Sequence, residues 1–256
     1  METLTAAAVQ ARLTTQRFGH PLYVYDELPS TNTTLRQLAA AGVPEGTVVA
    51  AARQTAGRGR MGRTFCSPPG GLYMSLLLRP ERLTDAGLLT SCAAVAVCRA
   101  IESLCPLTCG IKWVNDIWVD GKKVCGILAE GVVADGRQPA VVIGIGVNVS
   151  GTLPSELQAS AATLRQYGAR VAPAALLAAV LEQWERVYAA LPAGDFLEES
   201  RRRSVVLGRR VTVTGAGAPY EAFACGIDDT GRLLVRTDAG EEKALCSGEV
   251  SIRMSF

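Results

Sequence analysis

The segment IKWVNDIWVDGKKVCGILAE, residues 111–130, decides the class of fold. Two stretches that read as strands, 111–119 and 122–130, flank the dipeptide Asp120-Gly121, which is typical of a tight turn between antiparallel strands. Such a hairpin argues against a purely parallel, doubly wound sheet. We therefore expect an α+β fold with a mixed, mostly antiparallel sheet and packed helices.

The sequence on both sides of this hairpin supplies the other elements of the same layer. Apolar residues recur with the helical period over 173–191, where Pro173 stands in the first turn and favours a helix start. A serine or threonine at 30–31 can cap another helix that Gly42 ends. The expected strands are 22–26, 47–52, 72–79 and 140–149, and the expected helices are 4–17, 30–41, a segment starting near Thr84 or Asp85 and ending at Leu104, 160–167 and 173–191.

The pattern changes after about Arg203. Residues 208–256 carry short strands at close spacing, broken by glycines, which is typical of a small all-β unit. We therefore expect two domains, a larger one over 1–204 and a small β-barrel over 205–256.

Composition excludes several classes of protein. Of 256 residues, 48% are hydrophobic and 20% charged, which argues against a disordered chain. The net charge of +2 gives no global field for gripping long nucleic acids, and the single histidine, His20, excludes His-rich metal sites. The eight cysteines form no Cys-x-x-Cys pair, so we expect reduced thiols and no metal site. Neither a secretory signal nor a membrane span is evident, which favours the cytoplasm.

Residues 54–65 form the most unusual loop of the sequence. Three glycines in it allow close approach of the backbone to a ligand, and Arg58, Arg60 and Arg63 offer planar donors for phosphate or carboxylate oxygens. The loop lacks the P-loop pattern. A flexible surface turn, or a Gly/Arg segment that binds RNA, remains open from these residues alone.

Two other segments interrupt strands with unusual residues. Asn115 and Asp116 form a polar pair within an expected strand, which suggests either a lined pocket or a bulge. Gly144 and Gly146 lie within a strand, where glycine indicates close approach of a ligand or tight packing. Lys123 follows the hairpin turn and would by itself be interpreted as a solvated lysine.

Taken in order, these motifs resemble the biotin–protein ligases. The resemblance rests on Ser-Thr-Asn at 30–32, GRGRMGR at 57–63, KWVNDI at 112–117, GILAE at 126–130 and GIGVNV at 144–149. GID-x-x-G at 226–231 and SGEVSIR at 247–253 are similar to the small SH3-like C-terminal domain of that family. Val114 stands where the family commonly has proline and Phe65 where it often has tryptophan, and we expect both to alter packing or nucleotide affinity modestly.

The resemblance implies an ATP-dependent ligase that forms biotinyl-5'-AMP and transfers biotin to a lysine of a biotin carboxyl carrier protein domain. It implies Mg²⁺ with ATP and no tightly bound prosthetic group. The chain starts close to the catalytic part, so we expect the short form without an N-terminal DNA-binding domain, and no binding to DNA or membranes. An exposed sheet edge could pair two subunits as a homodimer or dock the carrier, and the sequence does not decide between them.

The resemblance also implies roles for residues of this chain. Lys123 is expected to be the main charge stabiliser, and Asp116 either orients or deprotonates the incoming lysine or helps to place Mg²⁺. The residues with implied roles are, for catalysis, Lys123, Arg58, Arg60 and Asp116; for biotin, Ser30, Thr31, Asn32, Gln54, Arg58, Gly59, Arg60, Ser75, Lys123, Gly144 and Gly146; and for the nucleotide, Arg58, Arg60, Arg63, Phe65, Asn115, Lys123, Asn148 and Arg253.

Two alternatives remain, of which only the second belongs to a different class of protein. A lipoate–protein ligase shares the fold and the adenylation chemistry, although the pair GRGRMGR and KWVND favours biotin. A nucleotide- or RNA-binding module without ligase activity would use the Gly/Arg loop together with the basic cluster at 201–203, 209 and 210.

Overall fold

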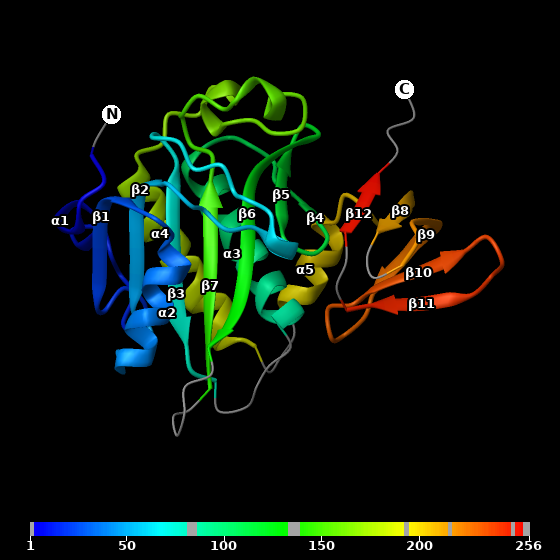
Figure 1. Cartoon of the computed structure of the whole chain (residues 1–256), viewed down its shortest axis with the longest axis horizontal. Helices are drawn as coiled ribbons and strands as arrows, with labels where there is room; N and C mark the ends of the chain where they lie inside the picture. The colour runs from blue at the N-terminus through cyan, green and yellow to red at the C-terminus, as the bar shows by residue number, and fades with distance from the viewer. Residues whose placement is uncertain are drawn as a thin grey trace.

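The computed structural model describes residues 3–80, 86–132, 139–191, 195–214, 217–246 and 249–252. Within these ranges a seven-stranded sheet forms the larger part of the molecule, in the order β1-β2-β3-β7-β6-β5-β4 (Figure 1). β1 and β2 pair in parallel, and the other neighbours are antiparallel, which confirms the expected mixed sheet. The strands are β1 Leu22–Leu28, β2 Val48–Gln54, β3 Leu72–Leu78, β4 Gly110–Lys112, β5 Asp116–Val119, β6 Lys122–Val132 and β7 Ala140–Val147.

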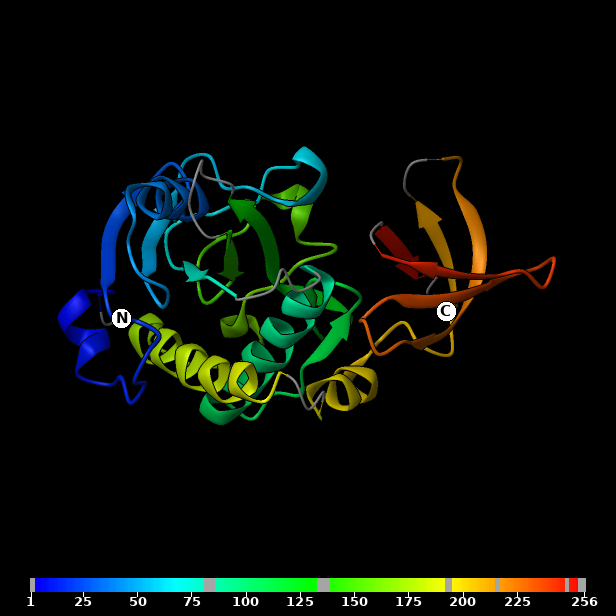
Figure 2. The same ribbon diagram turned by 90° about the horizontal axis from the view of Figure 1, so that it is seen from below.

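Helices cover both faces of this sheet (Figure 2). α3 (Ala86–Leu104) and α4 (Pro173–Ala189) pack on one face, and α2 (Thr31–Ala41) packs on the other. Since successive strand residues point to opposite faces, Val48 and Ala50 join the core under α3 and α4, whereas Val49 packs with Leu35 of α2. The shorter segments are α1 Ala6–Gln10, α5 Asp195–Arg203 and the 3₁₀ turns η1 Arg60–Gly62, η2 Ser155–Leu157 and η3 Leu164–Tyr167.

α3 is a core helix of the sheet layer. Its segment Gly87–Leu104 is the one described helix that is long and apolar enough to cross a membrane, and 67% of that segment is buried inside the protein. The buried part packs against α4 and the sheet, which accounts for its apolar composition.

A second sheet follows α5. In the described part of the chain it has five antiparallel strands in the order β11-β10-β9-β8-β12 and is SH3-like, as expected. Its buried valines and leucines form a core separate from that of the first sheet. The strands are β8 Arg210–Thr214, β9 Tyr220–Ile227, β10 Leu233–Thr237, β11 Glu242–Leu245 and β12 Glu249–Ile252.

The two sheets are joined through the turn between β4 and β5. Trp113 and Val114, only 4% and 5% exposed, pack into the core of the second sheet rather than the first. The Trp113 indole Nε1 donates a hydrogen bond of 3.0 Å to the carbonyl of Gly231. The peptide bond between Trp113 and Val114 is cis. The turn that carries the KWVND motif therefore belongs structurally to both parts of the molecule.

Three expected elements differ in the structure. The single strand over 111–119 was wrong, because Trp113 and Val114 leave the first sheet to fill the second core. The expected helix over 160–167 is only a 3₁₀ turn, and the N-terminal helix ends at Gln10. Past that end, the Glu185 carboxylate accepts hydrogen bonds from three consecutive backbone N–H groups, which fixes a non-helical path at residues 16–18. The proposed cap at Thr84 or Asp85 lies outside the described residues.

Asp228 stabilises the β9–β10 turn that receives Trp113. Burial opposes its ionisation, but hydrogen bonds from Thr230 and Arg232 outweigh this effect and lower the pKa of Asp228 from 3.8 to about 2. A folded-state pKa below the unfolded value adds stability above pH 4 that is lost as the pH falls towards 2.

We expect Asp228→Asn to lower the free energy of unfolding by about 1 kcal/mol at pH 7, a value that allows for solvent screening of this partly exposed group. Denaturant unfolding of both proteins between pH 7 and pH 3 measures the difference, which should shrink as the pH falls below 4. A difference that grows towards pH 3 would contradict this assignment.

Candidate active site

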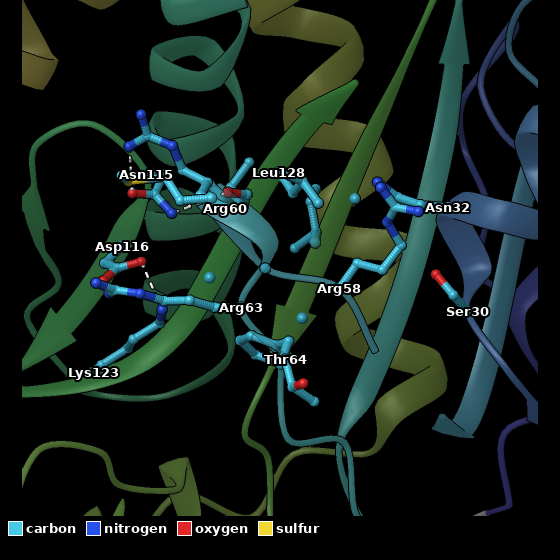
Figure 3. A pocket seen from close by; sticks show the side chains of 18 of the residues that line it. Ser30, Asn32, Arg58, Arg60, Arg63, Thr64, Asn115, Asp116, Lys123 and Leu128 are labelled. Carbon is cyan, nitrogen blue, oxygen red and sulfur yellow. Dashed lines mark hydrogen bonds and ion pairs between the residues drawn. The ribbon is translucent and has the colours of Figure 1, made fainter. Parts of the chain in front are cut away.

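A pocket lies on the face of the first sheet that carries α2, beyond the start of that helix (Figure 3). Its floor follows from strand register, because Gly126 pairs with Gly146, and Gly144 lies between Ser75 and Leu128. These residues share one face of three neighbouring strands. A Cβ at Gly144 would lie 2.1 Å from Asn32 Oδ1, and one at Gly146 would lie 2.5 Å from the Phe65 ring. The glycines therefore make room for these two side chains.

The start of α2 forms one wall. Ser30 caps the helix, its side chain accepting a hydrogen bond from the Thr33 N–H, so that Ser30, Thr31 and Asn32 face the pocket. Gln54, at the end of β2, accepts a 2.8 Å hydrogen bond from the Thr31 N–H, and its own amide donates to Ser67 Oγ at 2.9 Å. This wall presents hydroxyl and amide groups in fixed orientations.

The Gly/Arg loop crosses the pocket as a small backbone-paired hairpin. Arg58 pairs with Thr64, Gly59 N–H donates to the Arg63 carbonyl at 2.7 Å, and Phe65 N–H donates to the Gly57 carbonyl at 2.9 Å. Gly57 is required by close packing, because a Cβ there would lie 2.3 Å from the Phe65 carbonyl oxygen. The hairpin points Arg58, Arg60 and Arg63 at the pocket from above (Figure 3).

The opposite wall comes from the β4–β5 turn and the start of β6. Lys123 Nζ lies 2.7 Å from Asp116 Oδ1 and 5.6 Å from the centre of the Phe65 ring. Arg60 Nη1 donates to Asn115 Oδ1 at 3.2 Å, while the Asn115 amide donates to the carbonyl of Ile127. Asn115 and Asp116 are therefore held between the cations of the loop and of β6.

The pocket is built to bind anions. Of the described residues lining it, Arg58, Arg60, Arg63, Lys112 and Lys123 are cationic, and Asp116 is the one carboxylate. No histidine or cysteine is among those described lining residues, and the cations there can stabilise negative charge on a bound substrate. The part of the chain that the structure describes contains no group of three histidine, cysteine or acidic side chains suited to hold a metal ion.

Most residues singled out from the sequence meet in this pocket, but Ser75 and Asn148, of the described residues, do not. Ser75 does not line the pocket, because its buried hydroxyl is covered by the start of α2, where it donates to Asn32 Oδ1 at 2.5 Å and lies 2.8 Å from Thr31 Oγ1. Asn148 does not line the pocket, because its amide is turned away to donate to the carbonyl of Ala162. Arg253 lies outside the described residues. The residues brought together are Ser30, Thr31, Asn32, Gln54, Arg58, Gly59, Arg60, Arg63, Phe65, Asn115, Asp116, Lys123, Gly144 and Gly146.

Several residues that line the pocket were not predicted from the sequence. Gly126 could have been found, since it is a glycine within a strand, like Gly144. Val250 of β12 carries no such signal, because only the docking of the second sheet brings it to the pocket. Met61, Thr64, Met74, Lys112, Trp113, Ile127, Leu128 and Ile145 complete the lining.

Known proteins share this sequence and architecture. The profile of the biotin/lipoate A/B protein ligase family matches residues 24–148, and that of the biotin protein ligase C-terminal domain matches residues 206–253. The bifunctional ligase/repressor BirA of Bacillus subtilis is 38% identical over 251 residues, covering 94% of this chain and 77% of the relative. The chain belongs to the biotin/lipoate A/B protein ligase family.

Other members of the family extend the similarity. The biotin–[acetyl-CoA-carboxylase] ligase of Mycobacterium tuberculosis is 35% identical, over 90% of this chain and 88% of its own length. The biotin protein ligase of Aquifex aeolicus, solved in complex with biotin and ATP, has a TM-score of 0.80 and 31% identity, covering 91% of this chain and 99% of that structure. The ligase-family fold therefore extends over both sheets.

The close packing at Gly144 in the pocket floor can be tested by a substitution that adds one methyl group. We expect Gly144→Ala to weaken biotin binding on the order of 10-fold, because the new methyl group must push Asn32 out of its place. Isothermal titration calorimetry with biotin measures the effect. Gly131→Ala is the matched control on β6, since a Cβ there meets no atom within 4 Å. Equal affinities for the two variants would show that the Gly144 floor does not matter.

Proposed function

We propose that the protein is an ATP-dependent ligase that activates biotin as biotinyl-5'-AMP and transfers it to a lysine of a carrier protein. The observation that carries this proposal is the meeting of Arg58, Arg60 and Lys123 around one pocket in a chain of the ligase family. The neighbour with biotin and ATP bound supports the same pair of substrates.

In the first step a carboxylate oxygen of biotin attacks the α-phosphorus of ATP, and pyrophosphate leaves. Both reactants are anions, so the site must bring them together and stabilise the charge that develops on phosphorus. Lys123 is our candidate for bridging the biotin carboxylate and the α-phosphate, and Arg58 and Arg60 for holding phosphate oxygens. The ion pair with Asp116 fixes where the Lys123 ammonium lies.

In the second step the amine of a carrier lysine attacks the acyl carbon of biotinyl-5'-AMP, and AMP leaves. The amine must lose a proton, and Asp116 is the carboxylate at the pocket that could accept it or orient the amine. The wall of Ser30, Thr31, Asn32 and Gln54 supplies fixed hydroxyl and amide groups for the ureido ring of biotin. Phe65 would cover the adenine from the loop side.

We propose that ATP enters with Mg²⁺ as part of the substrate. The five cations of the lining suit the phosphates of such a complex, and Asp116 is the side chain that would face the ion. As the partner we propose a biotin carboxyl carrier protein domain, on the support of the relative named for acetyl-CoA carboxylase. We also propose that the protein is cytoplasmic. We propose a domain boundary between residues 204 and 205, which the two separate cores support.

Biotin-dependent exchange of pyrophosphate into ATP tests the first step, and transfer of biotin to a purified carrier domain tests the second. We expect both reactions with biotin. Lipoate–protein ligase is the alternative in the same family, and parallel assays with lipoate distinguish the two. Exchange with lipoate and not with biotin would overturn the proposal.

A further inference from the structure

Glu130 lies beside the pocket without lining it. It follows Gly126 and Leu128 at two-residue spacing on β6, so its side chain rises from the same face of the sheet as the pocket floor. The carboxylate is 14% exposed and is surrounded by Asn32 and Arg36 of α2 and by Arg58 of the loop. It thus joins three separate parts of the fold: sheet, helix and loop.

Each oxygen of Glu130 binds a different pocket residue. Oε2 accepts a 2.8 Å hydrogen bond from the amide of Asn32, and Oε1 accepts one of the same length from Arg58 Nη2. Asn32 Oδ1 receives the Ser75 hydroxyl at 2.5 Å, so the two partners together fix which end of the Asn32 amide points each way. Figure 3 shows the Arg58 guanidinium beside Asn32.

The bond to Glu130 uses one of the five N–H donors of Arg58. The remaining donors are available to a carboxylate or phosphate in the pocket, which Arg58 lines. A guanidinium at the end of a long side chain on a glycine-rich loop has many conformations, and a fixed carboxylate selects one of them before the substrate arrives. Arg36 is the weaker partner, with Nη1 3.7 Å from Oε1, and it does not line the pocket.

We propose that Glu130 is a positioning residue of this ligase. Its one carboxylate orients both the Arg58 guanidinium of the anion-binding loop and the Asn32 amide of the biotin-binding wall. This inference rests on the proposed function. It predicts that loss of the second acceptor oxygen impairs binding of the anionic substrates, although Glu130 does not line the pocket.

The test compares Glu130→Gln with Glu130→Asp and Arg36→Ala in the full chain. The glutamine side chain keeps the size but has an NH2 group in place of one oxygen, so either Asn32 or Arg58 would face a donor instead of an acceptor. We expect kcat/KM for biotin in pyrophosphate exchange to fall by about 10- to 100-fold in Glu130→Gln. Most of the loss should appear in KM, with the thermal unfolding temperature unchanged. Glu130→Asp keeps both oxygens and should recover part of the activity, and Arg36→Ala should stay within about 2-fold of the wild type.

A double-mutant cycle with Arg58→Ala separates positioning from a merely structural role. If Glu130 acts through Arg58, adding Glu130→Gln to Arg58→Ala should change the KM for ATP by less than about 2-fold. Fully additive losses, or wild-type kinetics in Glu130→Gln, would overturn the inference. If Glu130→Gln does not fold, Glu130→Asp must still show a raised KM for the inference to stand. Absence of exchange in the wild type would instead refute the proposed function.

Discussion

Lys123→Ala is expected to reduce biotin-dependent pyrophosphate exchange by about 10²- to 10³-fold, the usual cost of removing one preorganised charge stabiliser. The reason is electrostatic: Lys123 is the cation that β6 contributes to the pocket, and we propose that it bridges the biotin carboxylate and the α-phosphate. Biotin binding should change little, because we assign it mainly to the wall at the start of α2. Exchange assays and calorimetry with biotin measure the two quantities separately.

Lys122→Ala provides the matched control for this experiment. Lys122 is the neighbouring residue, but its ammonium donates to the carbonyl of Gln158 instead of facing the pocket. We expect it to retain wild-type exchange. An active Lys123→Ala enzyme, or equal losses in the two variants, would remove Lys123 from its proposed role.

Trp113→Ala is expected to lower the free energy of unfolding by about 3–5 kcal/mol, the range for removing a buried large aromatic side chain. The variant loses the packing of the indole in the second core and its hydrogen bond to Gly231. Because Asn115 lies in the same turn and Asp116 begins β5 directly after it, exchange activity should fall as well. Denaturant unfolding, followed by circular dichroism, gives the stability change.

Trp113→Phe separates packing from hydrogen bonding. It keeps most of the apolar surface and removes the N–H donor, so we expect a loss of about 1–2 kcal/mol, which includes the cost of leaving the Gly231 carbonyl unpaired. If Trp113→Ala unfolds at the same denaturant concentration as the wild type, the indole does not join the two sheets.

The sequence predicted those parts of the fold that depend on local patterns. The Asp120-Gly121 turn between β5 and β6 is set by two residues, both at positive φ, and the helix over Pro173–Ala189 is set by its period. The Gly/Arg loop indicated anion binding, and the strand glycines indicated close approach of a ligand or tight packing, because these residue types are unusual where they occur. The resemblance to biotin–protein ligases then supplied the order and roles that no single motif carried.

Features that depend on long-range packing could not be predicted. Trp113 and Val114 read as strand residues, and only the presence of the second core draws them out of the sheet. Asn148 directly follows the glycine-rich strand β7, and the sequence does not show that its amide donates to the carbonyl of Ala162. Glu130 stands at a strand position that is ordinary in sequence, and its importance depends on α2 and the loop meeting above it.

The shared turn between β4 and β5 limits how this chain could be recombined with its relatives. A hybrid that replaces residues 205–252 by another SH3-like sheet would have to bring an apolar socket for the indole and a carbonyl placed like that of Gly231. Grafts that match only the overall shape would leave the KWVND motif without its anchor. Compatibility at one tryptophan, rather than similarity over the whole sheet, should therefore decide which chimeras are active.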